Sequence, residues 1–422
     1  MNWDEIKLGE VMDVKHGYAF KSEFFADSGE FVLLSPGNCY ESGGLKLKGD
    51  KEKFYSGEFP REFLLAEGDM LVVMTDLINT APILGGSFLI PESNRFLHNQ
   101  RLGLVRVTDR SRIDKRFLYF LLNTHDYRGQ VRGSASGATV RHTSPGRIKN
   151  CTVRIPRDVP CQRKIADILF AYDDLMENNR QRMALLEQAA RELYREWFVR
   201  LRFPGHQRTR LKESSLGKIP SQWRVVCLGD ITTKIGSGAT PRGGEAAYQQ
   251  AGIPLIRSLN VYDDRFQDDG LAFLSDEQAD ELSQVEVKPR DILLNITGAS
   301  VARCCMAPGR HLPARVNQHV MIIRPDPEMA DPCFVLAAIN SQERKAQLLS
   351  LARAGGATRE ALTKDTIHGF QIVLPDATLL HRFAEFAGTI FQQREVLAHQ
   401  NHHLRTARDL LLPRLMSGEI EV

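Results

Sequence analysis

Two stretches of the chain repeat apolar residues at the spacing of an amphipathic helix. Residues 162–200 contain neither proline nor glycine, and their apolar positions advance in steps of three and four residues. At 1.5 Å per residue, a helix of this length would measure about 58 Å. Residues 380–412 carry an apolar side chain every seven residues. The pattern predicts two long helices, each with one apolar face.

Both predicted helices have polar residues in the middle of the apolar face. The face of the first helix consists of Ile165, Ile168, Tyr172, Leu175, Leu186 and Leu193, with Asn179 and Arg182 among them. The face of the second consists of Phe383, Ile390, Leu397, Leu404 and Leu411, with Gln393 and Gln400 among them. An antiparallel coiled coil would bring the polar centres together, and a polar residue in such a seam costs stability but fixes register. We expect Pro413 and Gly418 to end the second helix. A long surface helix packed on its own domain is the alternative for 162–200.

The rest of the chain is an internal duplication. Six groups of residues recur in the same order, with offsets between 218 and 222 residues. They begin with Trp3, Leu8 and Gly9, which recur as Trp223, Leu228 and Gly229, and they end with TVRIP at 152–156, which recurs as QIVLP at 371–375. An ordered set at a near-constant offset indicates two copies of one structural unit. Segments 41–60 and 263–283 differ between the copies, which favours two units that recognise different things.

Each copy shows the pattern of a small mixed α/β unit. Alternating apolar runs at 70–74, 102–107, 292–296 and 320–323 predict strands, and segments 116–123 and 332–340 predict short helices. The expected fold class is α+β, with two small α/β domains and two long paired helices. The expected boundaries are domain one at 1–157, helix one at 158–201, a linker at 202–222, domain two at 223–375 and helix two at 376–418.

Composition places the chain among soluble globular proteins. It has 422 residues, 42% of them hydrophobic and 25% charged, and no apolar run is long enough to span a membrane. The first residues lack the apolar segment of a signal peptide, and the seven cysteines lack paired spacing, so we expect a cytoplasmic protein. Residues 128–163 contain eight Arg or Lys and one acidic residue, a distribution suited either to phosphate contacts or to a solvated basic surface.

Motifs of catalysis are hard to find in this sequence. It contains no GxxxxGK[ST] segment, no HExxH, no Pro-Pro and no spaced Cys/His cluster. The glycine-rich segment 234–242 either contacts a phosphate through backbone N–H groups or is a plain loop. The sequence therefore favours a binding protein. A DNA-acting enzyme, nuclease or methyltransferase, with an unrecognised site and a coiled-coil adaptor that binds no DNA remain the alternatives.

Several short motifs together resemble those of a known family. They include GYAFK at 17–21, GATP at 238–241, VNQH at 316–319, QRKI at 162–165, EWFV at 196–199, LGKIP at 216–220 and RDLLLPRL at 408–415. Taken together along the chain, they are similar to those of the specificity (S) subunit of a type I restriction-modification enzyme. The opening of the second helix, HRF at 381–383, is less regular than QRKI, which blurs where a partner-binding face would begin.

The resemblance implies a DNA-binding subunit without catalysis or a cofactor of its own. It would bind double-stranded DNA and assemble with two copies of a modification subunit, which methylates adenine with S-adenosylmethionine, and with a restriction subunit that uses ATP and Mg²⁺. Each globular domain would be a target-recognition domain for one half of a split DNA site. Candidate DNA-binding residues, chosen because Arg reads guanine, Asn reads adenine and hydroxyls hold phosphates, are Tyr18, Lys21, Lys46, Lys48, Arg132, Thr139, Arg141, Thr240, Arg242, Arg257, Asn260, Arg303, Thr358 and Arg359.

Overall fold

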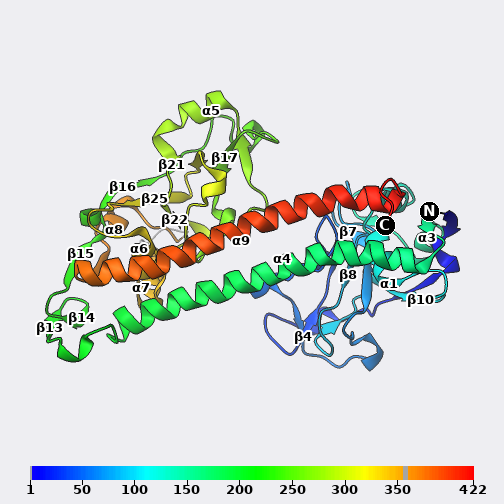
Figure 1. The fold of residues 1–422 in the computed structure, drawn as a ribbon, viewed down its shortest axis with the longest axis horizontal. Coiled ribbons are helices and arrows are strands. Elements are labelled where there is room, and N and C mark those ends of the chain that lie inside the picture. Colours follow the sequence, from blue (N-terminus) through cyan, green and yellow to red (C-terminus); the bar gives the residue numbers. More distant parts are fainter. Residues whose placement is uncertain (1, 355–359) are drawn as a thin grey trace. The chain divides into compact units, whose positions relative to one another are not determined.

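The computed structural model describes residues 2–354 and 360–422 and divides into two compact units (Figure 1). The first unit contains Met1–Met176 and His403–Val422, and the second contains Glu177–His402. Each unit therefore holds one globular segment and a part of both long helices. No helix among the described residues is long and apolar enough to cross a membrane.

The first unit is built on a four-stranded antiparallel sheet. Its order is β2 (Met12–His16), β10 (Leu102–Val107), β6 (Met70–Val73) and β8 (Ser87–Leu89). A second sheet has the order β3 (Phe25–Ala26), β5 (Phe54–Tyr55), β4 (Phe31–Leu33) and β9 (Phe96–Leu97), with β4 and β9 parallel. Two further pairs join β1 (Trp3–Lys7) to β12 (Thr152–Pro156) and β7 (Thr75–Asp76) to β11 (Arg141–His142). The helices are α1 (Lys115–Leu121), α2 (His125–Gly133) and α3 (Pro145–Lys149).

The second unit repeats this plan. Its main sheet has the order β16 (Thr232–Ser237), β25 (Val320–Pro325), β22 (Ile292–Asn295) and β23 (Cys304–Met306). The other sheet has the order β20 (Ala272–Leu274), β17 (Ile253–Ile256), β24 (Ala314–Val316) and β21 (Glu286–Val287). Strand β15 (Arg224–Cys227) pairs with β26 (Gln371–Leu374), and β18 (Val261–Tyr262) with β19 (Arg265–Phe266). The helices are α5 (Asp276–Glu281), α6 (Pro332–Asn340), α7 (Gln342–Ala354) and α8 (Lys364–His368).

The predicted duplication is confirmed at the level of topology. Equivalent strands occur in the same order in the two main sheets, and β17 pairs with β24 in parallel as β4 does with β9. Two equivalent glycines, Gly17 and Gly238, each lie against the backbone of another segment. A Cβ on Gly17 would lie 2.1 Å from the carbonyl oxygen of Asn99, and one on Gly238 would lie 2.1 Å from that of Val316. Only glycine fits where these two loops cross.

The two segments expected to diverge do fold differently. In the first unit, residues 41–60 contribute the short strand β5. In the second unit, residues 263–283 contribute β19, β20 and the helix α5. The framework is thus shared, while the segments inserted between framework strands give each unit its own surface.

The long helices are α4 (Val159–Tyr194), which continues as a π-helical turn at Arg195–Val199, and α9 (Ala377–Ser417). The expectation that Pro413 ends the second helix is wrong, because α9 continues past it to Ser417. The residues that follow, Leu415 and Met416, are buried in the core of the first unit. Their burial offsets the loss of the one backbone hydrogen bond that proline removes.

The segment 202–222, expected as a linker, contains a β-hairpin of β13 (Leu211–Ser214) and β14 (Gly217–Pro220). Phe203 and Ile219 are buried in a small cluster with Trp223 and Leu379. Proline and glycine, which indicated a linker, instead mark the turns around this hairpin.

Candidate nucleic-acid interface

Polar layers interrupt the helix seam in both units. In the second unit, Nδ2 of Asn179 donates a hydrogen bond of 2.9 Å to Oδ1 of Asn401, and Arg394 lies 3.5 Å from Glu187. From Asn179 to Glu187 along α4, the partner residue on α9 moves back from Asn401 to Arg394. The helix segments therefore run antiparallel, as predicted. In the first unit, Arg408 of α9 forms an ion pair with Asp173 of α4.

The predicted seam positions divide into two groups. All those on the seven-residue series of Ile165 and of Phe383 are buried or half-buried, namely Ile165, Tyr172, Asn179, Leu186, Leu193, Phe383, Ile390, Leu397, Leu404 and Leu411. In contrast, Ile168 and Leu175 are 36% and 47% exposed. The second column of the seam runs instead through Leu169 and Met176, which are buried. The prediction placed this column one residue early because both positions of each pair are apolar.

Arg182 lies beside Gln393 and Gln400, as expected, where all three line a shallow hollow of the second unit. Asn179 does not bond to these glutamines, because the side chain in register with it is Asn401. The seam therefore depends on the second polar column of α9, which consists of Arg394, Asn401 and Arg408.

In the first unit, three arginines surround the loop 134–140. Arg141 donates hydrogen bonds of 3.1 Å to the carbonyl oxygen of Gly137 and 3.0 Å to that of Arg132. Arg147 donates to Oγ of Ser136 over 3.0 Å. Among the described residues no carboxylate pairs with these guanidinium groups, and Thr139 is exposed on the same loop. The loop thus presents positive charge and a hydroxyl to solvent, which suits a DNA phosphate.

A second basic surface of the first unit consists of cations held over aromatic rings. Nζ of Lys15 lies 5.0 Å from the centre of the Phe63 ring, and Nζ of Lys53 lies 5.5 Å from that of Phe25. The guanidinium of Arg61 lies 5.7 Å from the centre of a further ring, that of Phe59. The rings belong to a cluster on the sheet of β3, β5, β4 and β9. Cations over partly exposed rings form a surface that can meet both phosphates and bases.

The other candidate DNA-binding residues of the first unit differ in how far their side chains are exposed. Lys21 is exposed beside Glu23, and Lys46 is exposed with its ammonium 5.5 Å from the centre of the Tyr40 ring. Tyr18 is half-buried against Phe20 and Phe63.

Lys48 has a structural role, because its ammonium donates to Oγ of Ser35 over 2.9 Å and to Oδ1 of Asn38 over 3.1 Å. Burial lowers its pKa. We therefore keep Lys21 and Lys46 as candidates, and not Lys48.

In the second unit two guanidinium groups lie over one tyrosine ring. The group of Arg303 is 4.5 Å and that of Arg265 is 5.3 Å from the ring centre of Tyr262. Tyr262 and Arg265 face each other across the two-residue strands β18 and β19. Strand β19 lies in the segment 263–283, which differs between the two copies. Arg265 is exposed, so this stack presents cationic donors on a short hairpin.

The other candidates of the second unit are mostly committed within the protein. Asn260 is fully buried, and its amide bonds to the backbone of Arg257 and Gln267. Arg257 donates over 2.6 Å to the carbonyl oxygen of Gly270. The hydroxyl of Thr240 is enclosed, without a hydrogen bond to any described group. Arg242 alone of these is exposed.

Asn260 repeats the role of Asn38 in the first unit. Oδ1 of Asn38 accepts from the backbone N–H of Ser35, as Oδ1 of Asn260 accepts from that of Arg257, both over 3.0 Å. Both amides organise a turn and are closed to a ligand. The remaining candidates, Thr358 and Arg359, lie outside the described residues.

The comparisons with known proteins agree on one family. Residues 1–188 match the family model described as the type I restriction modification DNA specificity domain. The chain is 25% identical over 354 residues to the type I restriction enzyme MjaIX specificity subunit of Methanocaldococcus jannaschii, covering 82% of this chain and 77% of that protein. It is 23% identical over 484 residues to the HindI specificity subunit of Haemophilus influenzae, covering 99% of this chain and 100% of that protein.

A solved structure shares the fold. The crystal structure of the type I restriction-modification system S subunit from M. genitalium aligns with a TM-score of 0.57 at 16% identity, covering 98% of this chain and 96% of that one. The chain is thus similar over most of its length to type I restriction-modification specificity subunits. Residues 1–188 carry the match to the DNA specificity domain, and the basic loops described above are the candidate surfaces for DNA.

Several basic residues of the run at 128–163 bond within the protein. Arg128 is buried and donates to the carbonyl oxygens of Glu41 and Pro82. Three others form ion pairs, Lys149 with Asp13, Arg157 with Asp4, and Arg163 with Asp114. Arg154, exposed over the Trp3 ring, and the arginines around loop 134–140 have no carboxylate partner among the described residues, so charge density along the sequence overstated the basic patch.

Sequence reasoning missed the cations over aromatic rings. Lys15, Lys53, Arg61 and Arg265 each lie next to or near an aromatic residue in the sequence, but so do many surface cations. For Lys53 and Arg265 the usable signal is their place in the segments 41–60 and 263–283, which differ between the two copies, whereas Lys15 lies on the framework strand β2. Phe24, Phe25 and Tyr40 of the first unit are exposed aromatic residues as well.

The described residues hold no group of three or more His, Cys, Asp or Glu with metal-ligand geometry. All seven cysteines are free thiols, and burial raises the pKa of Cys151 and of Cys333 to about 11. These thiols are therefore poor nucleophiles at neutral pH.

Proposed function

We propose that this chain is the non-catalytic DNA-reading subunit of a type I restriction-modification complex and that each unit reads one half of a split, asymmetric DNA site. The observation that carries the proposal is the repeated sheet order combined with different inserted segments. Two copies of one framework can dock on duplex DNA in equivalent ways. Different inserts then read different bases, which makes the two half-sites unlike.

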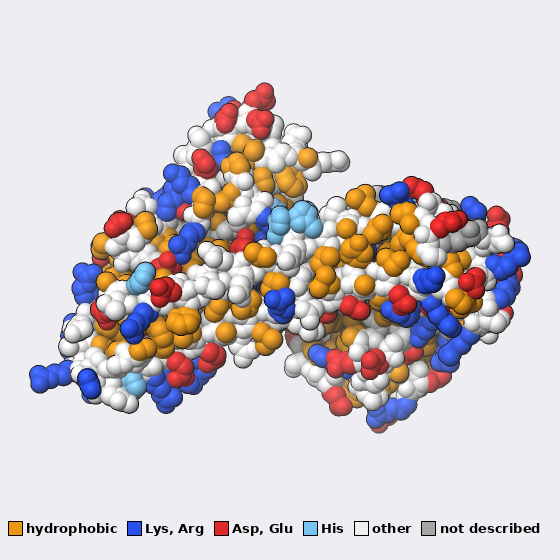
Figure 2. Space-filling model, viewed as in Figure 1, with side chains coloured by type: hydrophobic (Ala, Val, Ile, Leu, Met, Phe, Trp, Pro, Cys, Tyr) orange, Lys and Arg blue, Asp and Glu red, His pale blue; other side chains and the backbone are white. Residues whose placement is uncertain are grey.

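The chemistry of the exposed surface supports this role. The first unit offers the arginines of loop 134–140 and the cations over Phe25, Phe59 and Phe63. The second offers Arg242 and the arginines over Tyr262. Figure 2 shows Lys and Arg side chains interspersed with Asp and Glu, so specific groups rather than bulk charge would carry recognition.

The partners follow from the family. The chain would assemble with two copies of a modification subunit, which binds S-adenosylmethionine, and with a restriction subunit, which uses ATP and Mg²⁺. It would hold no cofactor itself. The paired segments of α4 and α9 are the proposed support of the two readers, because both helices contribute to each unit.

Mixing the purified chain with its modification subunit tests the proposal. A larger complex that shifts DNA of one split sequence in a gel is expected. Product formed by the isolated chain from DNA with Mg²⁺ or S-adenosylmethionine would instead show an enzyme. Absence of any gel shift with partners present would favour an adaptor that binds no DNA.

A further inference from the structure

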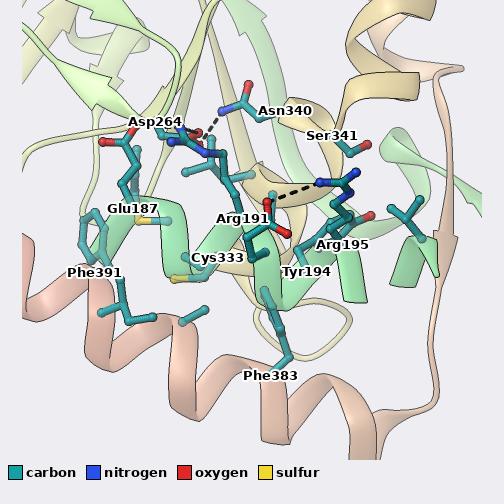
Figure 3. A pocket seen from close by; sticks show the side chains of 18 of the residues that line it. Glu187, Arg191, Tyr194, Arg195, Asp264, Cys333, Asn340, Ser341, Phe383 and Phe391 are labelled. Atoms are coloured by element: carbon teal, nitrogen blue, oxygen red, sulfur yellow. Dashed lines mark hydrogen bonds and ion pairs between the residues drawn. The ribbon is translucent and has the colours of Figure 1, made fainter. Parts of the chain in front are cut away.

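The second unit contains a cavity of about 320 Å³ lined by α4, α6, α7 and α9 (Figure 3). Rings of Phe383 and Phe391 on α9 and of Tyr194 on α4 line it, and the side chains of Arg191 and Arg195 lie on the α4 side, near Tyr194. A cavity of this size falls at the lower end of ligand pockets, which measure roughly 300–1,000 Å³.

The internal repeat shows what occupies the same place in the first unit. Helices α1 and α6 correspond because Asp114 and Asp331 cap their N-termini and because Asn123 and Asn340 bond to the backbone of β8 and β23. These pairs fix an offset of 217 residues.

The long helices correspond in the same way. The carbonyl oxygen of Asp158 accepts from the backbone N–H of Gln162, and that of Asp376 accepts from Leu380. This pair fixes an offset of 218 residues at the start of α4 and α9.

Aromatic rings fill this place in the first unit. Phe170 of α4 stacks on Tyr119 with 5.5 Å between ring centres and meets Phe120 edge-on at 4.8 Å. The guanidinium of Arg116 covers the Phe170 ring at 4.4 Å. Three rings and a cation thus close the space between α1 and α4.

Smaller residues replace these rings in the second unit. By the two offsets, Tyr119, Phe120 and Phe170 correspond to Leu336, Ala337 and Gly388. Leu336 and Ala337 line the cavity, and a Cβ on Gly388 would meet no atom within 4 Å. Gly388 itself is not among the lining residues, so the cavity corresponds to the space that Tyr119 and Phe120 fill in the other copy.

Guanidinium groups that could pack on an aromatic ring lie at the cavity of the second unit. Arg191, which is ion-paired with Glu187 and Asp264, and Arg195, which is ion-paired with Glu192, each keep 51% of the side chain open to solvent at the cavity. Nε of Arg394 is buried there without an acceptor among the described groups. A ring that enters would meet guanidinium groups, as Phe170 meets Arg116, and a polar tip on it would satisfy a buried N–H.

Exposed apolar side chains nearby point to a protein as the source of the ring. Val199, which lines the cavity, is 43% exposed, and Phe386 on the same helix as Phe383 is 58% exposed. The ring of Phe386 packs edge-on against Trp197 at 6.4 Å. A small molecule would leave these side chains in water, whereas a docked protein segment would cover them.

We propose that this cavity is a socket for one aromatic side chain of the modification subunit. The inference rests on the proposed function. It also predicts an asymmetry: the first unit fills the equivalent space with its own rings, so only the second unit receives an anchor there. The two copies of the modification subunit would then not bind in identical ways.

Filling the socket tests the proposal. Ala337→Phe supplies the ring that Phe120 supplies in the first unit, and Ala189→Phe adds the same ring at an exposed position of α4 outside the cavity. In titrations with purified modification subunit, Ala337→Phe is expected to weaken assembly at least about tenfold, as loss of an interface hot spot does, and Ala189→Phe to change it little. Circular dichroism melting shows whether each variant is folded.

A second arm uses the free chain and p-cresol, a lone phenolic ring. p-Cresol is expected to raise the melting temperature of the wild type and not that of Ala337→Phe, because only the former has room for it. Equal assembly of the wild type and Ala337→Phe, or equal loss in both variants, would overturn the socket while the proposed function stands. A wild type that neither assembles nor binds DNA would overturn both.

Discussion

Asn179 and Asn401 bond to each other in the helix seam of the second unit, with Nδ2 of the first 2.9 Å from Oδ1 of the second. Asn179 is almost fully buried, 1% exposed, between apolar turns of α4 and α9. Apolar residues there would pack in several registers, whereas two amides bond well in one. The pair therefore fixes how the two helix segments align.

Replacing the pair should separate stability from register. Asn179→Ala is expected to destabilise the chain by about 1–2 kcal/mol, because it leaves the half-buried amide of Asn401 without this partner. Asn179→Leu combined with Asn401→Leu should instead raise the urea midpoint. The register is checked by cross-linking a cysteine pair placed on the two helices, which should react less selectively in the double variant. A less stable double variant with unchanged cross-linking would contradict the role.

Asp291 and Asp69 occupy equivalent turns but should contribute differently to the free energy of unfolding. Oδ2 of each accepts from a backbone N–H three residues earlier, of Lys288 over 2.7 Å and of Ala66 over 3.0 Å. Only Asp291 is fully buried, and Arg324 binds it with two hydrogen bonds of 2.7 Å.

The bond to Asp291 raises the pKa of Arg324. Asp291→Ala should therefore cost about 3 kcal/mol, since it removes two charge-assisted hydrogen bonds from the half-buried Arg324, and Asp69→Ala about 1 kcal/mol, as expected for one hydrogen bond. Urea unfolding of both variants measures the difference. Equal costs would show that the ion pair adds nothing.

His98 should make the stability of the chain depend on pH. Its ring is buried, with Nε2 2.9 Å from the carbonyl oxygen of Leu102, and burial lowers its pKa from 6.5 to about 4. Between these values the unfolded chain binds a proton that the folded chain does not, so stability falls as pH drops from 6.5 towards 4, by up to about 3 kcal/mol.

The variant His98→Gln should remove this part of the pH dependence in urea unfolding at pH 7 and pH 5. The matched control, His125→Gln, changes a histidine whose side chain is 91% exposed and should leave the dependence unchanged. The same slope in all three proteins would contradict the assignment to His98.

The stack on Tyr262 should govern recognition by the second unit alone. Arg303→Ala with Arg265→Ala removes both guanidinium groups over the ring and should weaken binding at one half-site by about 1–3 kcal/mol for each base that an arginine reads. Lysines at both positions keep the charge without the planar fork and should restore nonspecific affinity more than specificity. Competition assays with each half-site mutated in turn measure both effects, and a weakening spread equally over the two half-sites would contradict the assignment.

Sequence patterns predicted the framework well because the framework repeats. The run at 102–107 became strand β10, the run at 332–340 became α6, and both long helices form where the apolar spacing placed them. These elements follow from local periodicity, which the chain carries twice. The error at Ile168 and Leu175 arose where two adjacent apolar residues left the face of the helix ambiguous.

The candidate interface was less predictable, because a surface role depends on tertiary structure. Asn260 and Lys48 have side chains suited to DNA, but the fold closes both into turns through Arg257 and Asn38. Arg265 became a candidate only because the hairpin of β18 and β19 places its guanidinium group over the Tyr262 ring. No pattern along the chain distinguishes a cation that faces solvent from one that braces a loop.

The most direct test of two unlike DNA readers on one framework is a binding-site selection from random duplexes by the chain assembled with its modification subunit. We predict one asymmetric sequence made of two specific parts and a spacer of fixed length and free composition. We also predict that the arginine variants over Tyr262 relax one part only. Selection of a single continuous sequence, or of no sequence above background, would contradict this function.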